Sequence, residues 1–222
     1  MSERTLQVLV DSFGKILSSG LAMTLPMTAL SFVFGLIIAL LTALVQVGRV
    51  PVLRQLARVY IWIIRGTPLL VQLFVIFYGL PTVGITTDAF TAAVIMFSIN
   101  TGAYEAETIR AAIESVPKGQ LEAGYCAGLT WHQTMRRIIL PQAMRTAFPP
   151  LSNSLISLLK DTSLASSITV VEMMQQTKMI AARTYEHFAL YCEVALIYLL
   201  FCTVLTGVQQ LCERAMSRKG GV

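Results

Sequence analysis

The sequence predicts an all-α membrane protein with five transmembrane helices and one polar helical hairpin between the third and the fourth. Of its 222 residues, 55% are hydrophobic and only 13% are charged, and the mean hydropathy is +0.67. A soluble domain carries about 25% charged residues, and a soluble core of this size could not cover so much apolar surface. The solvent of this chain is therefore expected to be lipid.

Five apolar stretches are long enough to cross a hydrocarbon layer of ~30 Å, which takes about 20 helical residues. The third and fourth are too polar for single helices in lipid, so they should face protein or a water-filled path. Residues 1–20 are expected to form a short extracytoplasmic N-terminal segment, and residues 213–222 a basic cytoplasmic tail. We expect the spans at about 21–46, 59–80, 89–111, 140–160 and 188–210.

The distribution of positive charge predicts the orientation of these spans. If the polar hairpin lies in the cytoplasm, most of the 17 Lys and Arg residues fall on the cytoplasmic side, and the loop at 81–88 carries none. Cytoplasmic loops of membrane proteins carry an excess of Lys and Arg. We therefore expect a multi-pass protein whose N-terminus is extracytoplasmic and whose C-terminus is cytoplasmic.

The polar stretch at about 117–138 contains the start and stop signals of two short helices. Pro117 suits a first helical turn, and Gly128 is placed to end that helix in a left-handed cap. Thr130 and Gln133 can form a capping box for the second helix. Two helices joined by a glycine turn also occur in DNA-binding proteins, but both ends of this hairpin are tethered to apolar spans. We therefore expect a docking surface for a partner protein and no contact with nucleic acid.

The hairpin also contains a spaced motif. A Glu-Ala-Gly triplet is separated by three residues from a glycine, and nine further residues separate that glycine from Ile-Ile-Leu-Pro. This spacing resembles the Glu-Ala-Ala cytoplasmic signature of ABC importer permeases. The chain departs from the signature at Gly124, where the family usually has alanine, and a glycine would loosen the helix by roughly 0.5–1 kcal/mol. The residues that match the signature are Glu122, Ala123, Gly124, Gly128, Ile138, Leu140 and Pro141.

Further stretches extend the resemblance in the same order along the chain. They are RGTPLLVQLF (65–74), AYEAETIRAAI (103–113), KGQLEA (118–123) and LLKDTSLA (158–165). These stretches are similar to the polar amino-acid branch of the family and, within that branch, most to permeases for L-cystine. Another polar amino acid, such as glutamine, arginine or histidine, is the alternative substrate.

The resemblance implies a type I ABC importer permease fold, in which residues 21–212 form the transmembrane permease domain. Two permease chains, identical or different, would form the pathway in the bacterial cytoplasmic (inner) membrane. Two copies of an ATP-binding subunit would dock on their coupling hairpins, and an extracytoplasmic solute-binding protein would deliver the substrate. The chain has no Gly-x-x-x-x-Gly-Lys-Ser/Thr loop. ATP and Mg are therefore expected on the partner subunit, with no cofactor and no enzymatic activity on this chain.

Polar residues inside the third and fourth spans are candidates for the substrate pathway. Such residues either connect helices by hydrogen bonds or line a route, and the sequence leaves both roles open. A zwitterionic substrate needs partners for its carboxylate and its ammonium group, and Lys160 and Asp161 carry the two required charges. The candidates are Asn100, Thr101, Tyr104, Asn153, Ser157, Lys160, Asp161 and Thr162.

Glu107 and Arg110 lie three residues apart near the cytoplasmic end of the third span. This spacing predicts a local ion pair, with a gate or an interface contact as the alternative. The two histidines and four cysteines show no metal-ligand spacing, so no metal site is expected.

Two other classes of membrane protein lack their usual signals in this sequence. Secondary transporters are often built from internal repeats, and no repeat is evident in 222 residues. An intramembrane enzyme would need a catalytic pair, and neither HExxH nor GxSxG occurs. An ATP-independent secondary transporter is the less favoured alternative.

Overall fold

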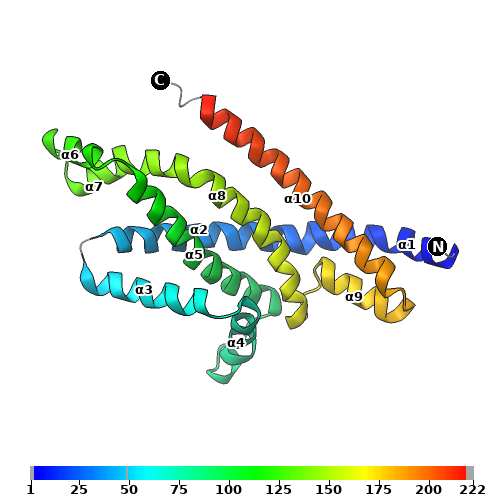
Figure 1. Cartoon of the computed structure of the whole chain (residues 1–222). Coiled ribbons are helices and arrows are strands. Elements are labelled where there is room, and N and C mark those ends of the chain that lie inside the picture. The colour runs from blue at the N-terminus through cyan, green and yellow to red at the C-terminus, as the bar shows by residue number, and fades with distance from the viewer. Residues whose placement is uncertain (1–2, 49, 219–222) are drawn as a thin grey trace.

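The N-terminal part of the chain is one long helix. In the computed structural model, which describes residues 3–48 and 50–218, α1 (Glu3–Ser19) continues through a π-helical turn (Gly20–Thr24) into α2 (Leu25–Val47). Figure 1 shows this helix, in blue, reaching from one end of the molecule to the other. The helix that contains the predicted first span thus begins at Glu3, well before the predicted start of that span near residue 21.

The reason for this difference is that α1 is amphipathic. One face of it bonds to the C-terminal part of the chain. Ser12 donates a hydrogen bond to Glu193 of α10 at 2.6 Å, and Thr5 donates one to Glu186, between α9 and α10, at 3.2 Å. Ile16 lies one helical turn after Ser12 on this same face and is completely buried. A helix with one polar side has a low mean hydropathy, so a search for apolar runs does not detect it.

The predicted second span (59–80) is broken rather than straight. The chain bends by 106° between α3 (Pro51–Gly66) and α4 (Leu69–Thr82). The break lies at Thr67 and Pro68, because the residue before a proline is disfavoured in a helix. Both residues have extended backbones, with ψ of 147° and 135°.

Gln72 satisfies the backbone at this break. Its side-chain amide donates hydrogen bonds to the carbonyl oxygens of Ile64 at 2.6 Å and Thr67 at 3.0 Å. Where a helix ends inside a membrane protein, its last carbonyl groups need such partners. The two halves are thus joined by one buried side chain, which also accepts a hydrogen bond from Asn100 at 2.9 Å.

The centre of the molecule consists of α2, α5 (Ala89–Ser115) and α8 (Leu140–Asp161). Asp88 caps α5, where its carboxylate accepts a hydrogen bond from the backbone N–H of Thr91 at 3.1 Å. The expected hairpin lies between α5 and α8 and comprises α6 (Lys118–Cys126) and α7 (Trp131–Thr134). A π-helical turn (Met135–Ile139) joins α7 to α8.

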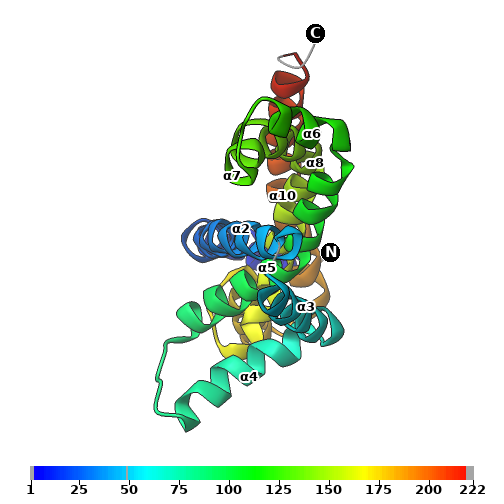
Figure 2. The same cartoon turned by 90° about the vertical axis from the view of Figure 1, so that its left-hand side faces the viewer.

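The C-terminal part doubles back along this centre. α8 passes into a 3-10 helix (Thr162–Ile168), which is followed by α9 (Met173–Thr184) and α10 (His187–Arg218). Figure 2 views the molecule nearly along α2 and shows α8, α10 and the hairpin on one side of it and α3 and α4 on the other. Residues 219–222 of the predicted tail lie outside the described residues.

Small residues let α2 and α5 approach closely. A Cβ atom on Gly35 would lie 2.8 Å from the side chain of Thr101, and one on Gly102 would lie 2.6 Å from the side chain of Ile38. Glycine at both positions therefore permits the contact between the two backbones, as is usual where helices pack in membranes. Tyr60 adds a hydrogen bond from α3, since its hydroxyl donates to the carbonyl oxygen of Ile99 at 2.6 Å.

The length and composition of the described helices support a membrane protein. Two helices, Glu3–Val47 and His187–Ala215, are long and apolar enough to cross a membrane on their own. Two bent pairs could each form a further, broken span. One is α3 with α4, and the other is the segment Trp131–Ile168 with α9, between which the chain bends by 50°. The remaining expected span, α5, has four charged residues in its second half: Glu105, Glu107, Arg110 and Glu114.

Candidate functional site

The first helix of the hairpin ends in the predicted glycine cap. Gly128 has a φ of +77°, in the left-handed region that glycine adopts readily. The N–H of Gly128 donates to the carbonyl of Tyr125 at 2.9 Å, and the N–H of Leu129 donates to that of Gly124 at 3.0 Å. This pair of hydrogen bonds is a Schellman motif, and it turns the chain sharply at a defined position.

The second helix begins with the predicted capping box. The hydroxyl of Thr130 accepts a hydrogen bond from the N–H of Gln133 at 3.4 Å, and the side chain of Gln133 accepts one from the N–H of Thr130 at 2.8 Å. These reciprocal bonds satisfy two donors that a helix start leaves free. The hairpin therefore has its own local hydrogen bonds at both sides of the turn.

Gly124 has a packing role that the sequence alone does not reveal. It is buried, and a Cβ atom at this position would lie 2.4 Å from Cγ2 and 2.6 Å from Oγ1 of Thr134. Thr134 is itself fully buried. The expectation that Gly124 only loosens the helix is thus incomplete, because the glycine makes room for the close contact between the two helices of the hairpin.

The residues of the signature divide into two groups by exposure. Glu122, Ala123 and Gly128 are exposed, and Figure 1 shows the hairpin projecting at one end of the molecule. Ile138 and Leu140 are half-buried and pack against the core cluster that contains residues of α2, α5 and α8. One group is accessible to a partner, while the other connects the hairpin to the helices of the centre. Pro141, exposed, lies in the first turn of α8.

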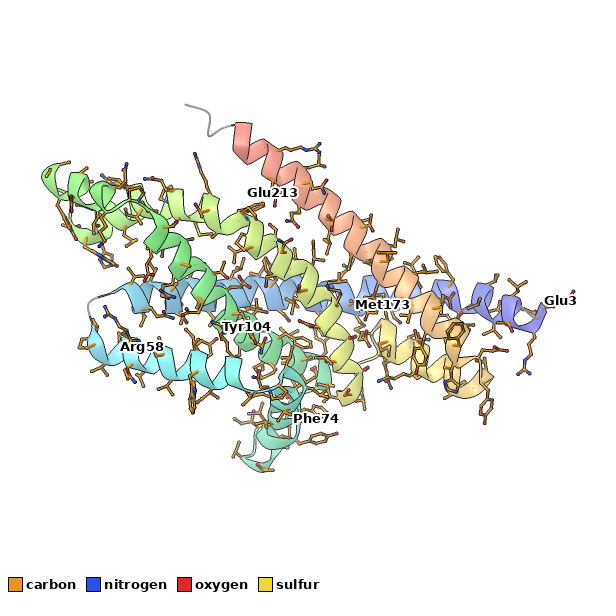
Figure 3. All side chains as sticks on the ribbon, in the orientation of Figure 1. Glu3, Arg58, Phe74, Tyr104, Met173 and Glu213 are labelled. Atoms are coloured by element: carbon orange, nitrogen blue, oxygen red, sulfur yellow. The ribbon has the colours of Figure 1, made fainter. Side chains whose placement is uncertain are left out.

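The three candidates on α5 have different surroundings. Asn100 is half-buried and donates its hydrogen bond to Gln72, and Thr101 is buried against Gly35. Both thus connect helices in this structure. Tyr104 is 44% exposed, and the guanidinium of Arg65 lies 5.1 Å from the centroid of its ring, a cation–π contact. Figure 3 labels Tyr104 in the middle of the molecule.

The candidates on α8 form an exposed polar face. Asn153, Ser157 and Lys160 are exposed and recur at helical spacing, so they lie on one side of the helix. Asn153 accepts a hydrogen bond from Gln209 of α10 at 3.2 Å.

The end of this face carries charge. Lys160 lines a cavity of about 770 Å³ between α8 and α10, together with Tyr191 and Tyr198. Its neighbour Asp161 is exposed, whereas Thr162 is buried and donates its hydroxyl to the carbonyl of Leu159 at 2.6 Å. Thr162 therefore supports the turn after α8 rather than the exposed face.

The predicted ion pair on α5 is confirmed and is part of a larger cluster. Arg110 lies 2.7 Å from the carboxylate of Glu107 and 2.6 Å from that of Glu114. These three residues line a cavity of about 420 Å³ with Gln46 and two arginines of α3, Arg54 and Arg58. The two arginines lie four residues apart, which places them on one face of α3.

Glu105 is a residue that the sequence analysis missed. Only 5% of its surface is exposed, and its Oε2 atom has no hydrogen-bond partner among the described residues. Glu105 lies in a series with Thr101, Ile109 and Ala112 at intervals of three and four residues, and these three residues are all buried. This spacing places Glu105 on the inner face of α5. A buried carboxylate in a membrane helix is expensive and commonly functional.

Comparisons with known proteins agree with these features. A model of the family "Binding-protein-dependent transport system inner membrane component" matches residues 31–218. The chain is 53% identical to the L-cystine transport system permease protein TcyB of Bacillus subtilis (strain 168), over 94% of this chain and 89% of that protein. It is 34% identical to a putative glutamine transport system permease protein GlnP of Rickettsia felis, over 95% and 98% of the two chains. A chain in the crystal structure of an amino acid ABC transporter with histidines superposes with a TM-score of 0.87 at 37% identity, covering 97% of this chain and all of that one.

The chain therefore belongs to the family of binding-protein-dependent transport system inner membrane components. It is the permease subunit of an ABC importer, a multi-pass transport component of the inner membrane and not an enzyme. The resemblance seen in the hairpin motif is confirmed, as is the type I ABC importer permease fold. Membership of this family implies that an ATP-binding subunit and a substrate-binding protein act with the chain.

The contact between Gly124 and Thr134 leads to a prediction about the hairpin. Gly124→Ala should destabilise the protein by about 1–3 kcal/mol, since the added methyl group overlaps with a buried side chain. Thr134→Ala removes the two atoms that would collide, so the double variant should recover most of the loss. The measurement is the thermal unfolding midpoint of the purified chain in detergent.

Gly119→Ala is the matched control for this experiment. Gly119 lies on the same helix, and no heavy atom lies within 4 Å of the position of an added Cβ. This variant should unfold at the wild-type temperature or slightly above it, because alanine favours helix. A double variant as unstable as Gly124→Ala would contradict the packing role of Gly124.

Proposed function

We propose that this chain forms the translocation pathway of an ATP-driven importer for L-cystine, with another polar amino acid such as glutamine as the alternative substrate. The observation that carries the proposal is the 53% identity to a protein named as an L-cystine permease, over nearly the whole of both chains. The identity to a protein named as a glutamine permease is 34%. The higher identity to the L-cystine permease supports L-cystine as the substrate, within a family that transports several polar amino acids.

The exposed face of α8 is the proposed part of the pathway on this chain. Asn153 and Ser157 offer amide and hydroxyl groups, and Lys160 and Asp161 offer a positive and a negative charge at one end. A zwitterion loses its water shell as it enters a membrane protein, and it needs such groups to replace that shell. Of the candidates on α5, Tyr104 with its exposed ring is the one best placed to take part.

The hairpin is the proposed contact with the ATP-binding subunit. Glu122, Ala123 and Gly128 form its exposed surface, and Ile138 and Leu140 connect it to the core. A movement of the hairpin would therefore be passed to α8 and α5. When ATP draws the two ATPase copies together, the hairpins would follow and shift the pathway between two states.

We infer an assembly of two permease chains, identical or different, two ATPase copies and one extracytoplasmic binding protein. ATP and Mg are held by the ATPase partner in this assembly. The Glu107–Arg110 pair, with Glu114, Arg54 and Arg58, is a candidate gate near the hairpin end of the pathway. This cluster contains positive arginine and negative glutamate side chains. Such a mixture suits the passage of a zwitterionic substrate, which itself carries one positive and one negative charge.

The proposed orientation places the hairpin in the cytoplasm and the N-terminus outside. Figure 1 shows the hairpin, the end of α2 and the start of α3 at one end of the molecule, and the start of α1 and α9 at the other. Five exposed or half-buried arginines of the described residues belong to elements at the hairpin end, which supports this orientation by the positive-inside rule. They are Arg54, Arg58, Arg136, Arg137 and Arg145.

Labelling of single cysteines tests this orientation. In a background without the four native cysteines, Thr86→Cys should react with a membrane-impermeant thiol reagent on intact cells. Lys118→Cys should react only after the cells are opened. Both positions are exposed, so access to the reagent depends on the side of the membrane. The reverse pattern would exclude a cytoplasmic hairpin.

A charge reversal on the hairpin tests the contact with the ATPase. Glu122→Lys changes an exposed residue, so the chain should still fold and insert, but it should co-purify with less ATPase and stimulate less ATP turnover. A loss of about ten-fold would match the removal of one charge-assisted contact. Gln55→Lys, at an exposed position of α3, should behave as wild type. Normal assembly and turnover with Glu122→Lys would contradict the coupling role.

The identity of the substrate can be tested by transport. The measurement is uptake of labelled amino acids into vesicles that contain the permease, the ATPase and the binding protein. Uptake of L-cystine should require ATP, and Ser157→Leu should reduce it about ten-fold, because an apolar side chain cannot replace the water lost by the substrate. Thr203→Leu changes an exposed hydroxyl residue of α10 that bonds only within its helix and should have little effect. Uptake of glutamine in place of cystine would refute the narrower proposal, and uptake of a sugar alone would refute the substrate class.

A further inference from the structure

A deep groove lies beside the hairpin and is separate from the proposed pathway. It has a volume of about 640 Å³ and opens between the end of α2, the start of α3 and α7 with the π-helical turn after it. A groove of this size is in the range that holds a drug-sized molecule. Most of its lining is apolar and includes Leu41, Leu44, Val45, Leu53, Trp131 and Met135.

The groove continues an apolar track along the surface of α2. Leu30, Phe34, Ile37 and Leu41 recur at intervals of three and four residues, and each is between 43% and 60% exposed. Such a stripe on a membrane-spanning helix faces hydrocarbon. Since Leu41 belongs both to the stripe and to the groove, an acyl chain that lies along α2 can enter the groove without leaving an apolar surface.

One rim of the groove carries the positive charge of Arg136, which belongs to the π-helical turn after α7. His132 of α7 lines the same rim, one turn earlier. No lining residue is a carboxylate, and within the described part of the chain Arg136 forms no ion pair. An arginine presents a planar set of donors that suits a phosphate group.

We propose that this groove binds an anionic phospholipid, with an acyl chain among the apolar residues and the headgroup phosphate on Arg136. Basic pockets between membrane helices on the cytoplasmic side commonly hold anionic headgroups. The proposal rests on the proposed orientation, which places the groove at the inner leaflet. The bound lipid contacts Trp131 and Met135 of the hairpin and Leu44 of α2, so it fills the space between the proposed coupling element and the end of the first span.

The test is native mass spectrometry of the full chain, purified in detergent and titrated with phosphatidylglycerol or phosphatidylcholine. This readout needs no transport activity, so its result is independent of the substrate proposal. Wild-type protein should retain phosphatidylglycerol in preference to phosphatidylcholine. Arg136→Ala should weaken that retention about five-fold, the effect expected for one arginine at an anionic headgroup.

Two further variants distinguish the groove from a general effect of charge. Arg137→Ala removes an exposed neighbouring arginine that does not line the groove, and it should change retention less than about two-fold. Val45→Trp keeps every charge but fills the groove, and it should reduce retention as much as Arg136→Ala does. A cooperative thermal unfolding transition near that of the wild type is the control that each variant is folded.

Three results would overturn the proposal. The first is equal retention of the two lipids by the wild type, and the second is an equal loss with Arg136→Ala and Arg137→Ala, which would indicate surface attraction only. The third is unchanged lipid retention with Val45→Trp. If that variant instead reduced co-purification of a second permease chain or of the ATPase, the groove would be a protein interface.

Discussion

The close packing of α2 against α5 is the contact on which the rest of the molecule depends. It requires glycine at positions 35 and 102, where any side chain would meet Thr101 or Ile38. In a membrane, apolar side chains gain little by leaving lipid, so helices associate through close contact and hydrogen bonds. With this pair in place, α3 attaches through the hydroxyl of Tyr60 and α8 packs on the other side of α5. The hairpin then projects from the far ends of α5 and α8.

Polar side chains stabilise the places where the helices are interrupted. Gln72 binds the carbonyls left free at the bend between α3 and α4 and connects them to Asn100. Glu172 caps α9 by accepting two backbone hydrogen bonds at 2.8 Å, and Tyr198 of α10 donates a third at 2.9 Å. Because unpaired backbone groups are costly in a membrane protein, these few side chains determine where the chain can change direction.

The hairpin has the rigidity that a coupling element needs. Its turn is closed by the Schellman motif, its second helix starts with a capping box, and its two helices touch through Gly124 and Thr134. A force on its exposed surface would therefore move the whole hairpin rather than deform it. Ile138 and Leu140 would carry that movement into the core. The groove proposed to bind lipid borders the same element, since Trp131 and Met135 line it.

Much of this architecture is encoded locally in the sequence. The all-α membrane class follows from composition, the glycine cap and the capping box follow from residues three or four positions apart, and the signature motif depends only on spacing. The Glu107–Arg110 pair is predictable for the same reason, since one turn of helix brings the two side chains together. Even the bend at Thr67 and Pro68 had a local signal, which the length of the apolar run concealed.

Only the tertiary structure decides which residues meet across the chain. Ser12 bonds to Glu193, 181 residues away, and this contact makes α1 part of the bundle. Likewise, Asn100 and Thr101 look like pathway residues until Gln72 and Gly35 are found beside them, whereas Asn153 and Ser157 remain exposed. A polar residue in a membrane helix can bond to another helix or face an open path. The choice depends on its distant neighbours, and a local pattern carries no information about them.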